Sequence, residues 1–126
     1  MQEFFQGYVL PVLNESQDED SYEEFWLANG NIILQACFDA NNGLRKKAEL
    51  EPLTSFVELD ADDPLTDWDQ ELLLECIVYG WAASLIVDDT NDDGVNKYNI
   101  LEDKYQSGLA RYGMFGFATV VTDYGI

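Results

Sequence analysis

The chain combines a very high negative charge with a large apolar fraction, and few kinds of protein accommodate both. Its 25 aspartates and glutamates stand against 6 lysines and arginines, for a formal net charge of −19, while 47% of its residues are hydrophobic. A disordered acidic segment lacks the aromatic and branched side chains that offset the entropy of ordering. Because 13% of this chain is aromatic, we expect a folded protein with a strongly anionic surface.

The composition also excludes several classes of function. The chain has no histidine, which excludes a histidine general base and a histidine-ligated zinc or iron site. Its one basic cluster, residues 45–47, is surrounded by carboxylates, so direct binding of nucleic acid is not expected. A nucleophile elbow, a phosphate-binding glycine loop and a C-x-x-C motif are all missing. We therefore expect no enzymatic activity, no cofactor and no metal.

Length and patterning indicate one domain in a reducing compartment. A chain of 126 residues is large enough for a single core. Cys37 and Cys76 lie in apolar helical stretches, which favours reduced, buried thiols over a disulfide. Glu3 and Pro11 interrupt the apolar N-terminal residues and no basic segment precedes them, so we expect neither a signal peptide nor a membrane span. Cytoplasmic synthesis is the expectation.

Apolar spacing predicts three core helices after an N-terminal extension, residues 1–20, whose short amphipathic helix docks only weakly. Ser21 and Glu24 form a capping box that opens the first helix, with a weakened turn at residues 41–43. Residues 72–86, apolar almost all round, form the central helix, and a third helix pairs antiparallel with it. The expected core comprises Phe25, Ile32, Ala36, Leu73, Ile77, Tyr79, Trp81, Ala83, Tyr98, Leu101, Tyr105 and Leu109.

Two further segments lie outside these helices. Pro52 and Pro64 bracket a long connection with extended segments between the first and second helices. After the helical domain, residues 21–113, the C-terminal residues 114–126 favour a strand with no polar face. This arm either folds back on its own domain or adds to a neighbouring subunit, and we favour the neighbour. The expected fold is mainly α: a three-helix bundle core with a long extended linker between helices one and two and a strand-like C-terminal arm.

One local motif is typical of a calcium loop. Asp89, Asn91, Asp93 and Gly94 match its first half, but its ninth and twelfth positions would be Lys97 and Ile100, which cannot complete the ligand set. We therefore interpret residues 88–94 as an acidic turn between helices.

The order of features resembles the small helical head-tail connector proteins of tailed bacteriophages, also called adaptors. The residues that carry the resemblance are 38–45, 51–53, 79–85, the acidic turn and 99–105. The resemblance implies a ring of about a dozen copies docked beneath the portal protein in the virion neck, with a downstream tail or neck protein below. It also implies that DNA passes through without specific binding. The parts implied to reach the portal or neighbours are Leu53, Phe56, Val57 and Leu59 in the linker, and an intersubunit arm with Phe115, Phe117, Val120, Val121 and Tyr124.

An alternative reading of the charge belongs to a different class of protein. An acidic DNA mimic or regulator would occupy the basic surface of a host or phage DNA-binding protein, in a salt-sensitive manner. The −19 charge favours this reading as well as a channel wall that repels DNA.

Overall fold

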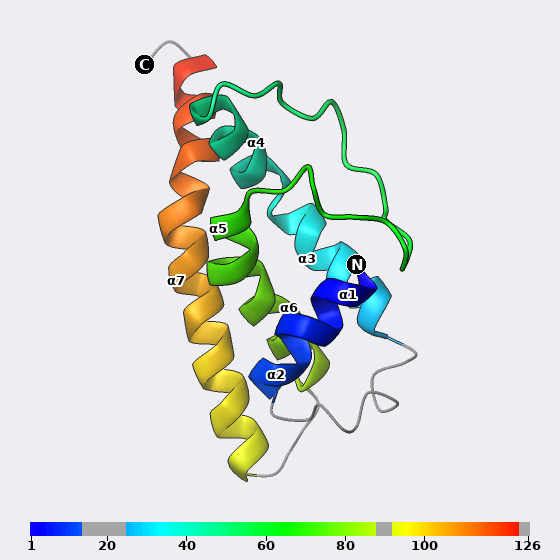
Figure 1. The fold of residues 1–126 in the computed structure, drawn as a ribbon. Helices are drawn as coiled ribbons and strands as arrows, with labels where there is room; N and C mark the ends of the chain where they lie inside the picture. Colours follow the sequence, from blue (N-terminus) through cyan, green and yellow to red (C-terminus); the bar gives the residue numbers. More distant parts are fainter. Residues whose placement is uncertain (14–24, 88–91, 124–126) are drawn as a thin grey trace.

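The structure, a computed structural model, describes residues 1–13, 25–87 and 92–123 (Figure 1). The side chains of residues 92–93 and 114–123 are not part of this description. The described residues are mainly helical and contain no strand, which confirms the expected helical class. The capping box at Ser21 and Glu24, and the domain boundary at residues 20–21, lie outside the described residues.

The N-terminal residues form part of the core. Helices α1 (Gln2–Phe4), η1 (Phe5–Val9) and α2 (Leu10–Leu13) follow one another without a break. Their four-residue apolar repeat faces inward, so Phe5, Val9 and Leu13 are at most 1% exposed. The Phe5 ring lies 5.1 Å from that of Trp26 and 5.5 Å from that of Trp81. The prediction of weak docking is therefore wrong, because these residues complete the packing around a central tryptophan.

The first expected helix is two helices, α3 (Trp26–Ala36) and α4 (Phe38–Lys47), which are separated at Cys37. The predicted weak turn at residues 41–43 lies instead inside α4. Helix α4 ends at a left-handed residue, Glu49 with φ of 63°, where the Leu50 N–H donates to the Arg45 carbonyl at 2.8 Å. This is the closing hydrogen bond of a Schellman turn, which glycine usually makes.

Residues 50–69 form a linker without helix or strand that leads to the central helix. That helix comprises α5 (Gln70–Leu72), η3 (Leu73–Ile77) and α6 (Val78–Leu85), and it begins where the Leu72 N–H donates to the Asp69 carboxylate at 3.0 Å. Helix α7 (Asp92–Asp123) packs against α4, η3 and α6. Figure 1 shows α7 along one side of the molecule and the linker along the opposite side.

The twelve core residues expected from the sequence divide into three groups. Six are buried: Leu73, Ile77, Trp81, Ala83, Leu101 and Tyr105. Tyr79, Tyr98 and Leu109 are partly buried and pack against them. The other three are exposed: Phe25 at 57%, Ile32 at 63%, and Ala36. Their assignment to the core is wrong because α3 turns Gly30 and Leu34 inward, which places the predicted four-residue register on the outer face.

The two cysteines lie together at the centre of the molecule, as buried free thiols. Cys37 Sγ is 3.9 Å from the Tyr105 hydroxyl, and Cys76 Sγ donates to the Tyr105 carbonyl at 3.8 Å. The hydrogen bond with Cys37 and burial both raise the pKa of the Cys76 thiol. Burial likewise raises the pKa of Tyr105. The Cys76 thiol therefore stays protonated at neutral pH and acts as a small apolar group.

The predicted strand-like arm is also corrected. Helix α7 continues to Asp123, through the residues expected to favour a strand, while Tyr124 lies outside the described residues. Strand propensity depends strongly on context, and a helix that is already formed adds one hydrogen bond for each residue it extends. The β-branched Val120 and Val121 therefore follow the helix that precedes them.

The close approach of α6 and α7 gives a test of this packing. A Cβ at Gly80 would lie 2.5 Å from the Tyr105 ring, so Gly80→Ala forces the two helices apart. We expect a loss of about 1–3 kcal/mol in the free energy of unfolding, measured by urea denaturation. The matched control is Gly7→Ala in η1, where a Cβ meets nothing within 4 Å. That control should keep or slightly raise stability, and equal losses in both variants would contradict the packing.

Candidate assembly surfaces

Asparagine side chains fasten the linker to the helical body. The Leu59 N–H donates to Asn31 Oδ1 at 2.8 Å, and Asn31 Nδ2 donates back to the Leu59 carbonyl at 2.9 Å. Asn42 makes the same pair of bonds with Leu53, at 2.8 and 3.0 Å. Each amide therefore satisfies both backbone groups of one linker residue, as a neighbouring strand would.

A third asparagine fixes the end of the linker. Asn41 is fully buried; its Oδ1 accepts from the Asp69 N–H at 2.8 Å, and its Nδ2 donates to the Asp67 carbonyl at 3.1 Å. Arg45 donates to the same Asp67 carbonyl at 3.1 Å, and to the Glu51 carbonyl at 2.7 Å. These contacts hold both ends of the linker on α4. A linker of 20 residues without regular structure thus has a defined path.

The four predicted docking residues all lie on this fastened segment. Leu53, Phe56 and Leu59 are half-buried, and the Phe56 ring contacts that of Phe38 edge-on at 6.1 Å. Val57 differs from them, because 68% of its surface is exposed. Of the four predicted docking residues, Val57 is therefore the one whose side chain faces solvent.

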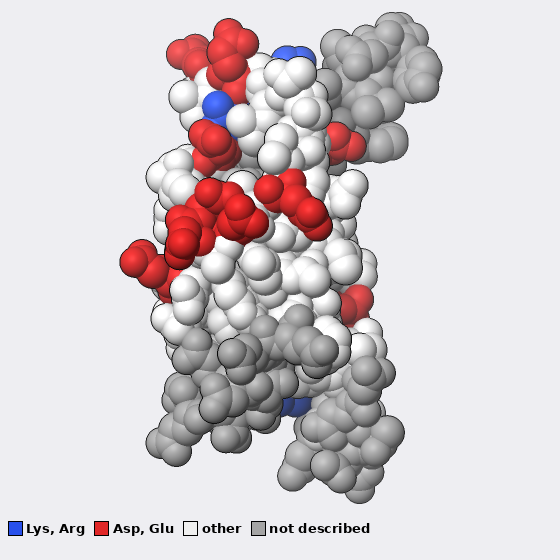
Figure 2. All heavy atoms as spheres, turned by 90° about the vertical axis from the view of Figure 1, so that its right-hand side faces the viewer, with Lys and Arg blue, Asp and Glu red and all other residues white. Residues whose placement is uncertain are grey.

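The surface around the linker is acidic. Residues 48–96 contain no lysine or arginine, and the linker and its flanks carry Glu49, Glu51, Glu58, Asp60, Asp62, Asp63, Asp67, Asp69 and Glu71. Figure 2 looks onto this side of the molecule, where carboxylates gather in a band across the surface. Such a concentration of one sign of charge repels polyanions and attracts cationic partners over roughly one Debye length, about 8 Å in physiological salt.

Several basic side chains contact groups other than carboxylates. Besides Arg45, Lys97 donates to the Leu13 carbonyl, and the Lys104 ammonium lies 5.0 Å from the centre of the Tyr79 ring. Arg111 does pair with an acid, Glu75, at 3.3 Å. Glu75 also accepts a hydrogen bond from the Tyr112 hydroxyl, and burial together with this bond raises the pKa of Tyr112 to about 12. The acidic side of the molecule thus keeps a strongly negative charge, because residues 48–96 include no lysine or arginine.

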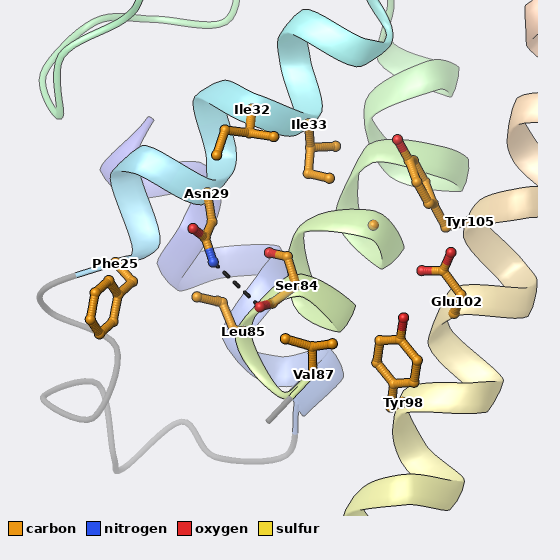
Figure 3. Close-up of a pocket in the computed structure, with 11 residues that line it drawn as sticks. Phe25, Asn29, Ile32, Ile33, Ser84, Leu85, Val87, Tyr98, Glu102 and Tyr105 are labelled. Atoms are coloured by element: carbon orange, nitrogen blue, oxygen red, sulfur yellow. Dashed lines mark hydrogen bonds between the residues drawn. The ribbon is translucent and has the colours of Figure 1, made fainter. Parts of the chain in front are cut away.

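A second candidate surface is an apolar groove between α3, α6 and α7 (Figure 3). Its volume is about 680 Å³. Ile32 and Phe25 lie on the α3 side, Leu85 and Val87 at the end of α6, and Tyr98 with Tyr105 on α7. Asn29 spans the groove wall by donating to the Ser84 carbonyl at 3.4 Å. In the sequence the signal for this surface is the apolar character of Phe25 and Ile32, which equally predicts a place in the core.

The remaining sequence predictions concern metals and membranes. In the acidic turn, Asp89 and Asn91 lie outside the described residues. Among residues that the structure does describe, no group of three cysteine, aspartate or glutamate side chains has the arrangement of a metal site. None of the helices in the described ranges combines the length and the hydropathy needed to cross a bilayer.

We compared the chain with protein-family models, with curated proteins and with solved structures, and none of the three comparisons gives a match.

The asparagine contacts give a prediction about the linker. Asn31→Ala leaves the N–H and carbonyl of Leu59 without their partner, so we expect the free energy of unfolding to fall by about 1–3 kcal/mol. Hydrogen exchange should show the Leu59 amide losing more protection than amides in α6. Asn99→Ala, at an exposed position on α7, is the control and should change neither quantity. Unchanged exchange at Leu59 would show that the amide does not hold the linker.

Proposed function

We propose that the protein is a structural component of a tailed-phage virion, an adaptor that forms a ring between the portal and the next neck or tail protein. The observation that carries this proposal is the linker: an irregular segment held at Leu53, Leu59 and Asp67 by buried or half-buried asparagines. A segment held so firmly, with Val57 turned outward, has the construction of a docking surface. The resemblance described from the sequence implies that the same segment reaches the portal or a neighbouring subunit.

The charge of the protein suits a channel for DNA. A wall that carries many unpaired carboxylates repels phosphates, so passing DNA does not adhere to it. The same charge opposes ring formation, because every copy carries −19. Subunit contacts must therefore come from uncharged surfaces, and the exposed apolar side chains of the described residues include Val57, Phe25 and Ile32.

The C-terminal residues supply the proposed contact between subunits. Residues 115–121 contain no charged side chain, although the chain as a whole carries a charge of −19. Their backbone is helical rather than extended, so the proposed arm is the end of α7, and strand augmentation is not part of the proposal.

The DNA mimic remains the second candidate, because the acidic band in Figure 2 would also suit a basic protein surface. The two proposals differ in where the protein is found. An adaptor is a stoichiometric part of purified particles and forms density below the portal in electron micrographs of the neck. A mimic is absent from particles and is recovered from infected cells with a DNA-binding protein, in a complex that dissociates as salt is raised. Absence from particles would end the adaptor proposal.

Because the linker is the proposed docking surface, a substitution at Val57 should impair assembly and leave folding intact. Val57→Asp changes an exposed side chain, so stability should stay within roughly 0.5 kcal/mol of the unchanged protein. A carboxylate buried in a docking contact should nevertheless lower incorporation into particles by about tenfold or more. Incorporation is measured by mass spectrometry of particles made with the variant as sole source. Thr66→Asp adds the same charge elsewhere on the linker, and an equal effect there would contradict a specific contact at Val57.

A further inference from the structure

The apolar groove between α3, α6 and α7 lacks a cover among the described residues. Phe25, Ile32 and Val87 at its edges are 57%, 63% and 55% exposed. Among the described residues that line it, Glu102 is the one with a charged side chain. Such a concentration of exposed apolar surface on a protein of charge −19 marks a contact with another apolar surface.

The chemistry of this chain restricts what can fill the groove. Residues 14–24 include Glu15, Asp18, Glu19, Asp20, Glu23 and Glu24, and residues 88–91 are Asp-Asp-Thr-Asn, so neither sequence supplies an apolar cover. Residues 115–121, Phe-Gly-Phe-Ala-Thr-Val-Val, are the uncharged apolar stretch outside the described core. They are the segment of this chain whose chemistry matches the groove.

A subunit cannot place its own C-terminal residues in its own groove. Helix α7 is continuous from Asp92 to Asp123, and Glu102, at the groove, precedes residue 117 by 15 residues. At a rise of 1.5 Å per residue, the two positions lie about 22 Å apart along a helix. Figure 1 shows the beginning and the end of α7 at opposite ends of the molecule. Residues 115–121 can therefore reach such a groove only in a second copy.

We propose that the groove of one copy receives residues 115–121 of another. This proposal rests on the ring function above and specifies the contact that joins its subunits. Charge supports the pairing: of the described residues that line the groove, Glu102 alone is charged, and the inserted residues carry no charge. Among contacts between chains of charge −19, this one brings few like charges together.

The position of the two surfaces determines the kind of assembly. The donor and the acceptor lie at different places on the subunit, so the contact is heterologous and passes from each copy to the next. A heterologous contact closes into a ring when its rotation divides a full turn, and otherwise it continues as a filament. A single self-complementary patch would instead stop at a dimer.

Two substitutions on exposed isoleucines test the groove. Ile32→Glu places a carboxylate at the groove edge, whereas Ile100→Glu makes the same change on α7 at a residue that is 58% exposed and does not line the groove. Sedimentation of the unchanged protein should show oligomers larger than a dimer. Ile32→Glu should weaken their association about tenfold or more, and Ile100→Glu should leave it within about twofold. Equal effects would overturn the proposal.

Mixing two chains tests the same contact by covalent trapping. One chain carries Ile32→Cys and the other Val120→Cys, and the native thiols are buried and do not compete. Mild oxidation of the mixture should give a disulfide between the two different chains, at several times the yield of either chain alone. Absence of this cross-link from a protein that is found in particle necks would overturn the groove contact and leave the ring function standing. A cross-linked oligomer of a protein absent from particles would overturn the ring function and support the contact.

Discussion

The fold depends on the burial of Trp81. This side chain is fully buried at a point where the N-terminal helices, α3 and α6 meet, and its Nε1 donates to the Trp26 carbonyl at 2.8 Å. Gly30 makes room for it, because any Cβ there would lie 2.4 Å from the indole ring. A large aromatic group with a satisfied polar atom gives both apolar contact and a fixed orientation. Three segments that are distant in sequence are thereby held in one arrangement.

The linker is strongly acidic, yet it is held against the helical body. Apolar packing alone could not fix a linker with so many carboxylates, and the chain has only six lysines and arginines with which to form ion pairs. The uncharged side-chain amides of Asn31, Asn41 and Asn42 hold the linker, because they bind its backbone atoms and leave its side chains free. The position of the linker thus depends on hydrogen bonds to its backbone, and its acidic side chains are not needed to hold it there.

The sequence predicted the helical class, the central helix and the stripe on α7, because long apolar runs with helical spacing have few other solutions. It failed where the packing partner decided the outcome. The inward face of α3 follows from Gly30 meeting Trp81, which is a contact between residues 51 positions apart. Residues 41–43 suggested a weak turn by propensity, but the amide bonds of Asn41 to the linker made the helix favourable there. The groove was missed because exposed Phe25 and Ile32 look identical to core residues in a sequence.

The use of the basic side chains has a consequence for the solution behaviour of the protein. Arg45 and Lys97 donate to backbone carbonyls and Lys104 lies against a tyrosine ring, so much of the scarce positive charge is occupied within the fold. Dissolved cations must therefore balance most of the charge of the carboxylates. These cations form an ion atmosphere around the protein, which behaves as a compact polyelectrolyte. In the proposed ring, neighbouring copies would bring their ion atmospheres together, so assembly would take up cations from the medium. Raised ionic strength, which weakens most complexes between opposite charges, would then favour the proposed ring.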